Sequence, residues 1–286
     1  MKMAVIGCGL IGGSMALSWK RAGIVDEVIA FGHNPATLQK ALDKGAADAV
    51  TTSMEEAVKD ADIVVSAVPV EAMESVFTEM APFLKPDAVV TDVGSTRQTV
   101  IAAARKGLGD KFHQYAPAHP IAGGEMPGVD YASADLFDEK VVISTPDEGM
   151  DPKVVTFIEE AWRKAGARVQ AMSPLQHDLT FASVSHLPHV LAYALVDMIA
   201  REENAQEKLK MAGAGFRDFT RIASSSPVMW RDICLSNREA LSHELKRYRA
   251  SLDTLQKYID ESDGKALESV FENAVRNRRG LVFPGK

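Results

Sequence analysis

Two polar residues in the first half of the chain, Ser95 and His119, lie in segments whose composition would let a side chain act on a bound molecule. Ser95 belongs to DVGST at residues 92–96, and His119 belongs to AHPIAGGE at residues 118–125. Pro120 holds the histidine before it extended, and the small residues that follow allow a ligand to approach closely. Imidazole titrates near neutral pH, so His119 is a candidate general base or hydrogen-bond acceptor toward a hydroxyl. Each residue also has a structural interpretation, because a serine at a helix start is a common N-cap and a lone histidine is often structural.

Two histidines in the second half of the chain, His186 and His189, lie three residues apart in the motif SHLPH. On a helix they would share one face, and this spacing also occurs in metal sites. Neither a cysteine nor an acidic residue stands at a ligand spacing from them. We therefore predict no metal site.

A pair of arginines, Arg217 and Arg221, lies four residues apart in GFRDFTRI at residues 215–222. Guanidinium groups at that spacing could face a carboxylate together, as an anionic substrate requires. The alternative is an ion pair with Asp218 at an interface or a helix end.

The segment GCGLIG at residues 7–12 has the G-x-G-x-x-G spacing of a dinucleotide-binding loop. It follows an expected strand, Met3–Ile6, and opens an expected helix, Leu10–Ala22, which is the context that such a loop requires. The helix N-terminus would supply amide donors and a positive dipole end for phosphates. A tight turn without a ligand is the alternative. The residues of this loop predicted to bind the cofactor are Gly7, Gly9, Leu10, Ile11 and Gly12.

The choice between the two nicotinamide cofactors depends on the residues after the second strand. NAD-preferring sites usually carry an acidic residue there, whereas this chain has His33 and Asn34. Both can donate to a 2′-phosphate, so NADP is favoured and NAD is the alternative. The two residues also fit a turn before Pro35. Val68 and Pro69, after the fourth strand, would border the nicotinamide.

Short apolar runs alternate with helical periodicity over the first 172 residues, which predicts an α/β domain with a doubly wound parallel sheet. Ligands of such sheets lie beyond the carboxyl ends of the strands, where the polar motifs above are found. The expected strands are Met3–Ile6, Val28–Phe31, Asp62–Ser66, Ala88–Asp92, Phe112–Pro117, Lys140–Ser144 and Arg168–Ala171. The expected helices are Leu10–Ala22, Ala36–Lys44, Ser53–Asp60, Glu71–Phe83, Thr96–Lys106 and Pro152–Ala165.

Long helical periodicity replaces the strands from Ser173 onward, which divides the chain into a nucleotide domain at residues 1–172 and an all-α domain at residues 173–286. Amphipathic helices with little sheet of their own often bury their apolar faces against a second copy, so a homodimer is expected. The expected helices are Ser173–Arg201 with a kink at Pro188, Pro227–Ile259 and Lys265–Arg278.

The composition of the 286-residue chain points to a small-molecule partner. Its 32 basic and 39 acidic residues give a formal net charge of −7, which provides no broad basic face for nucleic acid or an anionic membrane. Two cysteines indicate a reducing cytoplasm. The longest stretch without a charged residue, 179–196, carries two histidines and a proline, so no membrane span is predicted.

Taken together, these motifs resemble the prephenate/arogenate (cyclohexadienyl) dehydrogenases of tyrosine biosynthesis over nearly the whole chain. The resemblance rests on VIGCGLIGGSMA, DVGST, AHPIAGGE, SHLPH and GAGFRDFTRIASSSPVMWRDI. It implies a Rossmann domain, a helical dimerisation domain and an active site in the cleft between them.

The resemblance also implies roles for individual residues. His119 would accept the proton of the ring C4 hydroxyl as hydride leaves C4 for the nicotinamide. Ser95 would orient His119 and this hydroxyl. Arg221 would bind a substrate carboxylate, and His189 with His186 would position substrate or water. Three further residues would lie near the substrate: Glu125 and Asp218 in an acidic network that controls access and holds Arg221, with Asp218 contributed across the dimer, and Trp230 at the substrate mouth.

Two other functions are weighed against this one. A β-hydroxyacid dehydrogenase shares the domain arrangement but relies on a lysine early in the helical domain, and residues 173–207 contain none. A non-catalytic NADP-binding regulator would have no need of His119, Ser95 and Arg221 together. The sequence does not distinguish prephenate from arogenate as substrate.

Overall fold

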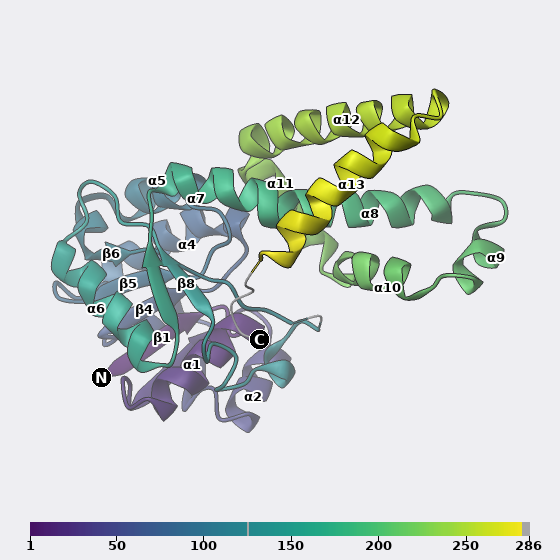
Figure 1. Cartoon of the computed structure of the whole chain (residues 1–286). Helices are drawn as coiled ribbons and strands as arrows, with labels where there is room; N and C mark the ends of the chain where they lie inside the picture. The colour runs from purple at the N-terminus through teal and green to yellow at the C-terminus, as the bar shows by residue number, and fades with distance from the viewer. Residues whose placement is uncertain (125, 282–286) are drawn as a thin grey trace.

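Six parallel strands form the central sheet of the N-terminal half in the computed structural model, which describes residues 1–124 and 126–281 (Figure 1). Their order is β3-β2-β1-β4-β5-β6, so the strand order reverses between β1 and β4, where doubly wound folds bind dinucleotides. The predicted doubly wound parallel sheet is therefore confirmed. The strands are β1 (Lys2–Ile6), β2 (Glu27–Phe31), β3 (Ala49–Thr51), β4 (Ile63–Ser66), β5 (Val89–Asp92) and β6 (Tyr115–Ala116).

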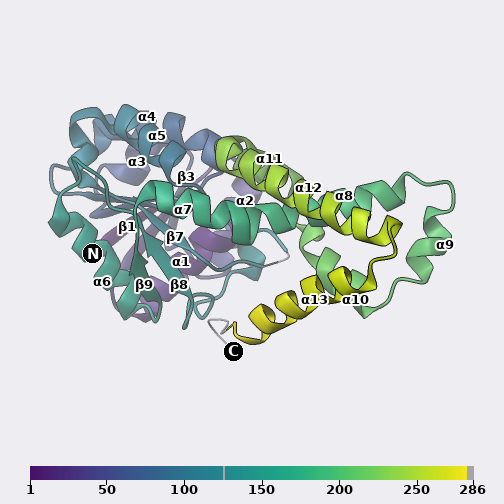
Figure 2. The same cartoon turned by 45° about the horizontal axis from the view of Figure 1, so that its top comes forward.

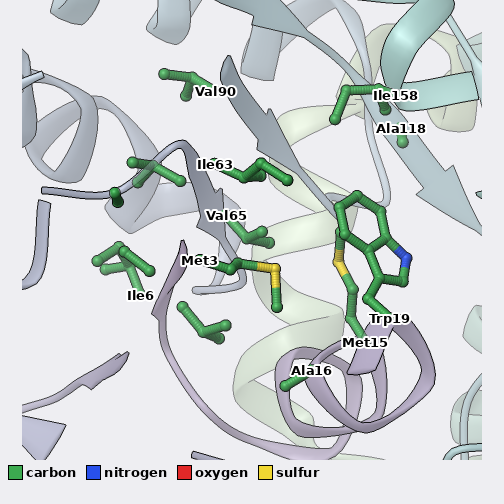
Figure 3. Packing of buried hydrophobic residues seen from close by; sticks show 14 of the residues in the cluster. Met3, Ile6, Met15, Ala16, Trp19, Ile63, Val65, Val90, Ala118 and Ile158 are labelled. Carbon is green, nitrogen blue, oxygen red and sulfur yellow. The ribbon is translucent and has the colours of Figure 1, made fainter. Parts of the chain in front are cut away.

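Helices cover the sheet and bury its apolar side chains. Trp19 of the first helix meets Trp162 edge to face at a centroid distance of 5.6 Å, and both are wholly buried. Figure 3 shows Met15 and Trp19 packed near Met3 and Val65 of the sheet. Trp162 belongs to the helix Pro152–Lys164, so this aromatic pair packs two helices against each other. The helices of this domain are α1 (Leu10–Arg21), α2 (Pro35–Asp43), α3 (Met54–Val58), α4 (Met73–Met80), α5 (Gln98–Leu108) and α6 (Pro152–Lys164).

A second, three-stranded sheet differs from the sequence prediction. The expected strand at residues 112–117 ends as the two-residue β6, and the chain then forms β7 (Ala118–Pro120), which pairs antiparallel with β8 (Val141–Ser144). β8 pairs in parallel with β9 (Arg168–Ala171). Pro117 has no amide hydrogen to continue the first ladder, which accounts for the change of sheet. His119 therefore lies on a strand opposite Ile143, and not in a loop after the main sheet.

The C-terminal half is helical, and its first helix leaves the nucleotide domain and extends along the helical domain (Figures 1 and 2). The expected helix 173–201 is interrupted by a π-helical turn at Ala182–His186, since Pro188 cannot donate the usual backbone bond. The expected helix 227–259 breaks at Asn237. The helices are α7 (Pro174–Phe181), α8 (Leu187–Ala200), α9 (Ala205–Lys210), α10 (Ala214–Thr220), α11 (Pro227–Ser236), α12 (Arg238–Asp260) and α13 (Gly264–Arg279).

Candidate active site

The glycine loop between β1 and α1 has the geometry of a dinucleotide cradle. Gly7 has a φ of +92°, and a Cβ at Gly12 would lie 2.5 Å from the Gly7 carbonyl oxygen. A Cβ at Gly9, in contrast, would meet no atom within 4 Å, so this position is open to a ligand. Gly9 is also the N-cap of α1 and offers no side-chain oxygen to its first amides. Those amides remain free to bind phosphate oxygens, so the loop fits the predicted cofactor.

Two other segments border the same loop. The Val68 Cγ1 lies 3.1 Å from the position that a Cβ of Gly7 would take, which places the end of β4 against the cradle. The Leu10 Cδ2 lies 3.3 Å from the corresponding position at Gly124. The segment after His119 therefore passes over the start of α1, and the cofactor site adjoins the predicted catalytic segment.

The residues after β2 have structural roles as well as an exposed position. The Asn34 Oδ1 accepts hydrogen bonds from the amides of Ala36 at 2.9 Å and Thr37 at 3.4 Å, which makes Asn34 the N-cap of α2. The exposed His33 ring packs edge to face on Phe31. The side-chain oxygen of Asn34 thus has the structural role expected of a residue in this turn, while the Nδ2 group can still donate to another partner.

A chain of three side chains connects β7 to α7. The His119 Nδ1 lies 2.8 Å from the His177 Nε2, and the His177 Nδ1 lies 2.9 Å from the Asp178 Oδ1. His177 and Asp178 are buried, while His119 is half-buried at the edge of the site. The two imidazoles are 61° apart in plane, and His177 stacks on Phe181. Packing and hydrogen bonds together fix the direction in which His119 points.

The donor at each step of this chain follows from the carboxylate at its end. Asp178 accepts, so the His177 Nδ1 carries the proton and the His177 Nε2 is an acceptor. The His119 Nδ1 must then donate, which leaves the His119 Nε2 with a free lone pair. Burial, together with the nearby His177, Arg97 and His186, holds the pKa of His119 well below its ordinary value. His119 is therefore a neutral imidazole with an acceptor nitrogen available to a ligand.

Asp178 is held as a carboxylate by the start of α5. Burial by itself would raise its pKa, but the hydrogen bond from His177 and the amides of Gln98 and Arg97, at 2.9 and 2.8 Å, lower it below the ordinary value. Asp178 thus caps a helix of the other domain, 80 residues away in sequence. The N-cap alternative for Ser95 is wrong, because α5 begins at Gln98 and this carboxylate receives its first amides.

The helical domain places a second group of side chains together. His189 stacks on Trp230 with ring centroids 3.6 Å apart, and its Nδ1 donates to the Ser185 carbonyl oxygen at 2.9 Å. Burial lowers the pKa of His189, and the positive charge of Arg221 lowers it further. The His189 Nε2 is consequently an acceptor.

His186 lies between the two groups, in the π-helical turn. It is 1% exposed, and its Nδ1 lies 3.2 Å from the Asn237 Nδ2, which donates to it. Burial lowers the pKa of His186 to about 4. Its ring centroid lies 6.1 Å from that of Trp230. His186 therefore supports the wall of the site as a neutral, buried ring.

The other predicted site residues are Asp218, Arg221 and Glu125. Asp218 is exposed and its Oδ1 lies 3.8 Å from the Arg217 Nε, so within one chain these two form a surface ion pair. Arg221 begins the 3-10 turn after α10. Glu125 lies outside the described residues. The structure thus brings His119, His186, His189, Trp230 and Arg221 toward one region, and it places Asp218 on the surface.

Sequence reasoning missed His177 and Asp178. Both lie within QHDLTF, a segment expected to be plain helix, and both occupy positions on the buried face of α7. Two adjacent polar residues on an otherwise apolar helix face were the available signal, since buried polar groups require partners.

A glycine cradle at the start of α1 and a neutral histidine in the strand that leads to its border are typical of a nicotinamide-dependent oxidoreductase. Residues 15–171 match the family model of the prephenate dehydrogenase nucleotide-binding domain, and residues 173–273 match that of the prephenate dehydrogenase dimerization domain. The chain belongs to the prephenate dehydrogenase family.

Named relatives agree with this assignment. The chain is 36% identical to the cyclohexadienyl dehydrogenase of Zymomonas mobilis, over 98% of this chain and 95% of that protein. A crystal structure of prephenate dehydrogenase from Aquifex aeolicus, in complex with hydroxyphenyl propionate and NAD+, superposes with a TM-score of 0.90 at 34% identity and covers 98% of each chain. Synechocystis arogenate dehydrogenase superposes with a TM-score of 0.81 at 27% identity, over 99% of this chain and 100% of that chain.

Proposed function

We propose that this protein catalyses the oxidative decarboxylation of prephenate or arogenate, with NADP as the preferred hydride acceptor. The products are 4-hydroxyphenylpyruvate from prephenate and tyrosine from arogenate. The observation that carries the proposal is the neutral His119, whose Nε2 lone pair is fixed by His177 and Asp178 in the segment that reaches the glycine cradle at Gly124. Family membership and the names of the relatives support the same reaction.

The cofactor would be held by the first turn of α1 and by the segments that border it. Gly9 leaves room for the pyrophosphate, the amides of Leu10 and Ile11 donate to it, and Val68 with Pro69 borders the nicotinamide. When bound, the nicotinamide ring supplies an acceptor for the hydride from ring C4.

His119 would act on the C4 hydroxyl of the substrate. Its Nε2 accepts the hydroxyl proton as the C4–H bond breaks, and the oxygen becomes a carbonyl. The bond to the ring carboxylate then breaks and carbon dioxide leaves. The electron pair of that bond makes the ring aromatic, and the carbonyl oxygen takes back the proton from His119 to become the phenol hydroxyl. Ser95, half-buried in the loop after β5, would orient the hydroxyl and His119. A neutral, pre-oriented base accounts for catalysis without a covalent step.

The helical wall would hold the anionic substrate. Arg221 would bind a carboxylate, and His189, fixed between Trp230 and the Ser185 carbonyl group, would present its Nε2 to substrate or water. Because the chain carries a net charge of −7, local cations have to capture the substrate against an overall field of the wrong sign.

The preference for NADP rests on the residues after β2. No carboxylate stands there to repel a 2′-phosphate, His33 is exposed, and Asn34 retains its Nδ2 donors beyond the capping bond. The NAD+ in the Aquifex aeolicus complex belongs to that protein.

We further propose that two copies associate through the helical domain in the cytoplasm. The helical run Pro174–Ala200 is long and apolar enough to cross a membrane by length and composition, yet only 28% of its most apolar window is buried within one chain. Buried Asp178 and three histidines in that run disfavour a hydrocarbon environment. A second copy would cover its exposed apolar residues, as the match to a dimerization domain supports. Asp218, on the surface of one chain, would then reach the partner's site.

A matrix of initial rates with prephenate or arogenate, each with NADP or NAD, tests the proposal. We expect NADP reduction with at least one substrate at a higher kcat/KM than NAD reduction. Activity in none of the four pairs would contradict the reaction and favour a non-catalytic regulator, and faster NAD reduction would contradict the cofactor preference.

A further inference from the structure

Arg97, at the end of the loop between β5 and α5, is wholly buried. Its Nη2 donates to both oxygens of Asp92 at 2.9 Å, and its Nη1 donates to the carbonyl oxygens of Gly94 at 2.7 Å and Ala118 at 3.1 Å. Tyr115 completes the cluster, since its hydroxyl donates to the Asp92 Oδ1 at 2.6 Å. A buried guanidinium with this number of partners is an organised centre and not an isolated ion pair.

The two carbonyl groups bound by Arg97 precede the two residues predicted to act on the substrate hydroxyl. Gly94 is followed by Ser95, and Ala118 is followed by His119. Gly94 and Ser95 lie in the loop after β5 of the parallel sheet, whereas Ala118 and His119 lie in β7 of the mixed sheet. One guanidinium group thus fixes the backbone beside both side chains.

The backbone of Arg97 adds a third connection. Its amide donates to the Asp178 Oδ1, the oxygen that also binds the His177 Nδ1. The backbone of Arg97 therefore contacts Asp178, and its side chain contacts β7, the strand that carries His119.

Charge neutralisation alone does not explain this arrangement. Two buried apolar residues of similar volume would replace a buried ion pair at little cost in stability, and a carboxylate would be satisfied without the two carbonyl contacts. Arginine is the residue type whose planar group can bind a carboxylate and two carbonyl groups at once.

We infer that Arg97 is a positioning residue that sets His119 relative to Ser95. This inference rests on the proposed function. The ionisable groups around His119 are His177 and Asp178 on α7, His186 in the π-helical turn, and Arg97 with Asp92 in the loop after β5. Arg97 is the permanent cation among them, so its removal would ease protonation of His119.

The test compares three variants of the full chain. The double variant Asp92→Asn with Arg97→Gln removes both buried charges together, which avoids an unpaired carboxylate. Arg97→Lys keeps the charge beside Asp92 but cannot reproduce the planar set of bonds. Arg163→Gln, on the exposed face of α6 and paired with Glu159, is the matched control for loss of an arginine.

The measurements are kcat, KM, the pH profile of kcat/KM, the thermal midpoint and NADPH affinity. In the double variant we expect kcat to fall by about 100-fold, the effect of a small misplacement of a reacting group. KM and NADPH affinity should stay within threefold, and the acid limb of the profile should move to higher pH. Arg97→Lys should lose less activity and keep the acid limb in place, because it restores the charge.

The inference is overturned if the double variant retains kcat within threefold of the wild-type value, or if its acid limb does not move. Should the double variant fail to fold, a full wild-type kcat in Arg97→Lys together with a lowered thermal midpoint would assign Arg97 to stability alone. Wild-type protein that is inactive with all four substrate and cofactor pairs would instead refute the proposed function.

Discussion

Replacement of Asp178 by asparagine tests whether the buried histidine chain sets the reactive form of His119. Three donors meet the carboxylate at 2.8 to 2.9 Å, from the amides of Arg97 and Gln98 and from the His177 Nδ1. An asparagine side chain is the same size, but its Nδ2 must face at least one of these donors. His177 then keeps at most a neutral amide as partner, which holds its Nε2 as an acceptor toward His119 less strongly than the carboxylate does.

The magnitude follows from the bond that is lost. A hydrogen bond to a charged group contributes about 1.5–3 kcal/mol, and each ~1.4 kcal/mol changes a population tenfold. The reactive tautomer of His119 should therefore become about 10- to 100-fold rarer, with kcat falling in proportion. The unsatisfied donor should also lower the free energy of unfolding by about 2 kcal/mol.

The assay is steady-state turnover with the best substrate and cofactor pair, alongside urea unfolding. Asp62→Asn is the control, since Asp62 also accepts a backbone amide and a lysine but lies at the start of β4, away from the site. A kcat for Asp178→Asn within threefold of the wild-type value would refute the histidine chain as the cause of the reactive tautomer.

Three further predictions concern stability, the cofactor and assembly. The pKa of His186 falls from 6.5 to about 4 on folding, so below pH 6.5 the unfolded chain binds a proton that the folded chain does not. Urea unfolding should therefore show that this group lowers the free energy of unfolding by about 2 kcal/mol between pH 7 and pH 5. A pH dependence that is unchanged in His186→Gln would contradict this. Gly9→Ala should fold normally but bind NADPH at least tenfold more weakly in a fluorescence titration. The control Gly264→Ala, where an added Cβ also meets no atom within 4 Å, should bind NADPH as the wild type does. Equal NADPH affinities of Gly9→Ala and the wild type would exclude the loop from the cofactor site. Sedimentation should show a dimer that dissociates in the double variant Met198→Glu with Phe271→Glu, two exposed apolar positions, and a monomeric wild type would contradict the proposed dimer.

Local patterns predicted the dinucleotide half of the fold well. Strands β1 and β4 are buried on both faces and read as continuous apolar runs, and the glycine spacing has meaning only between a strand and a helix. Both signals lie within a few residues, so neither requires knowledge of the tertiary fold.

The parts that escaped prediction depend on contacts distant in sequence. The change of sheet at Pro117 places His119 opposite β8, which no periodicity indicates. The group that caps α5 is the Asp178 carboxylate of α7 and not the Ser95 hydroxyl, and the partner of His119 lies 58 residues away. Tertiary packing created these pairs, and a single sequence shows only that the polar residues need partners.

The most direct test of the account is the rate of hydride transfer in His119→Asn, followed by stopped-flow absorbance of the reduced cofactor. Asparagine can still donate to the His177 Nε2 but offers no imidazole nitrogen to take the hydroxyl proton. We predict a rate lower by about 10²- to 10⁴-fold, the usual contribution of a general base, with NADPH affinity unchanged. A near-normal rate would contradict the central claim that His119 is the base.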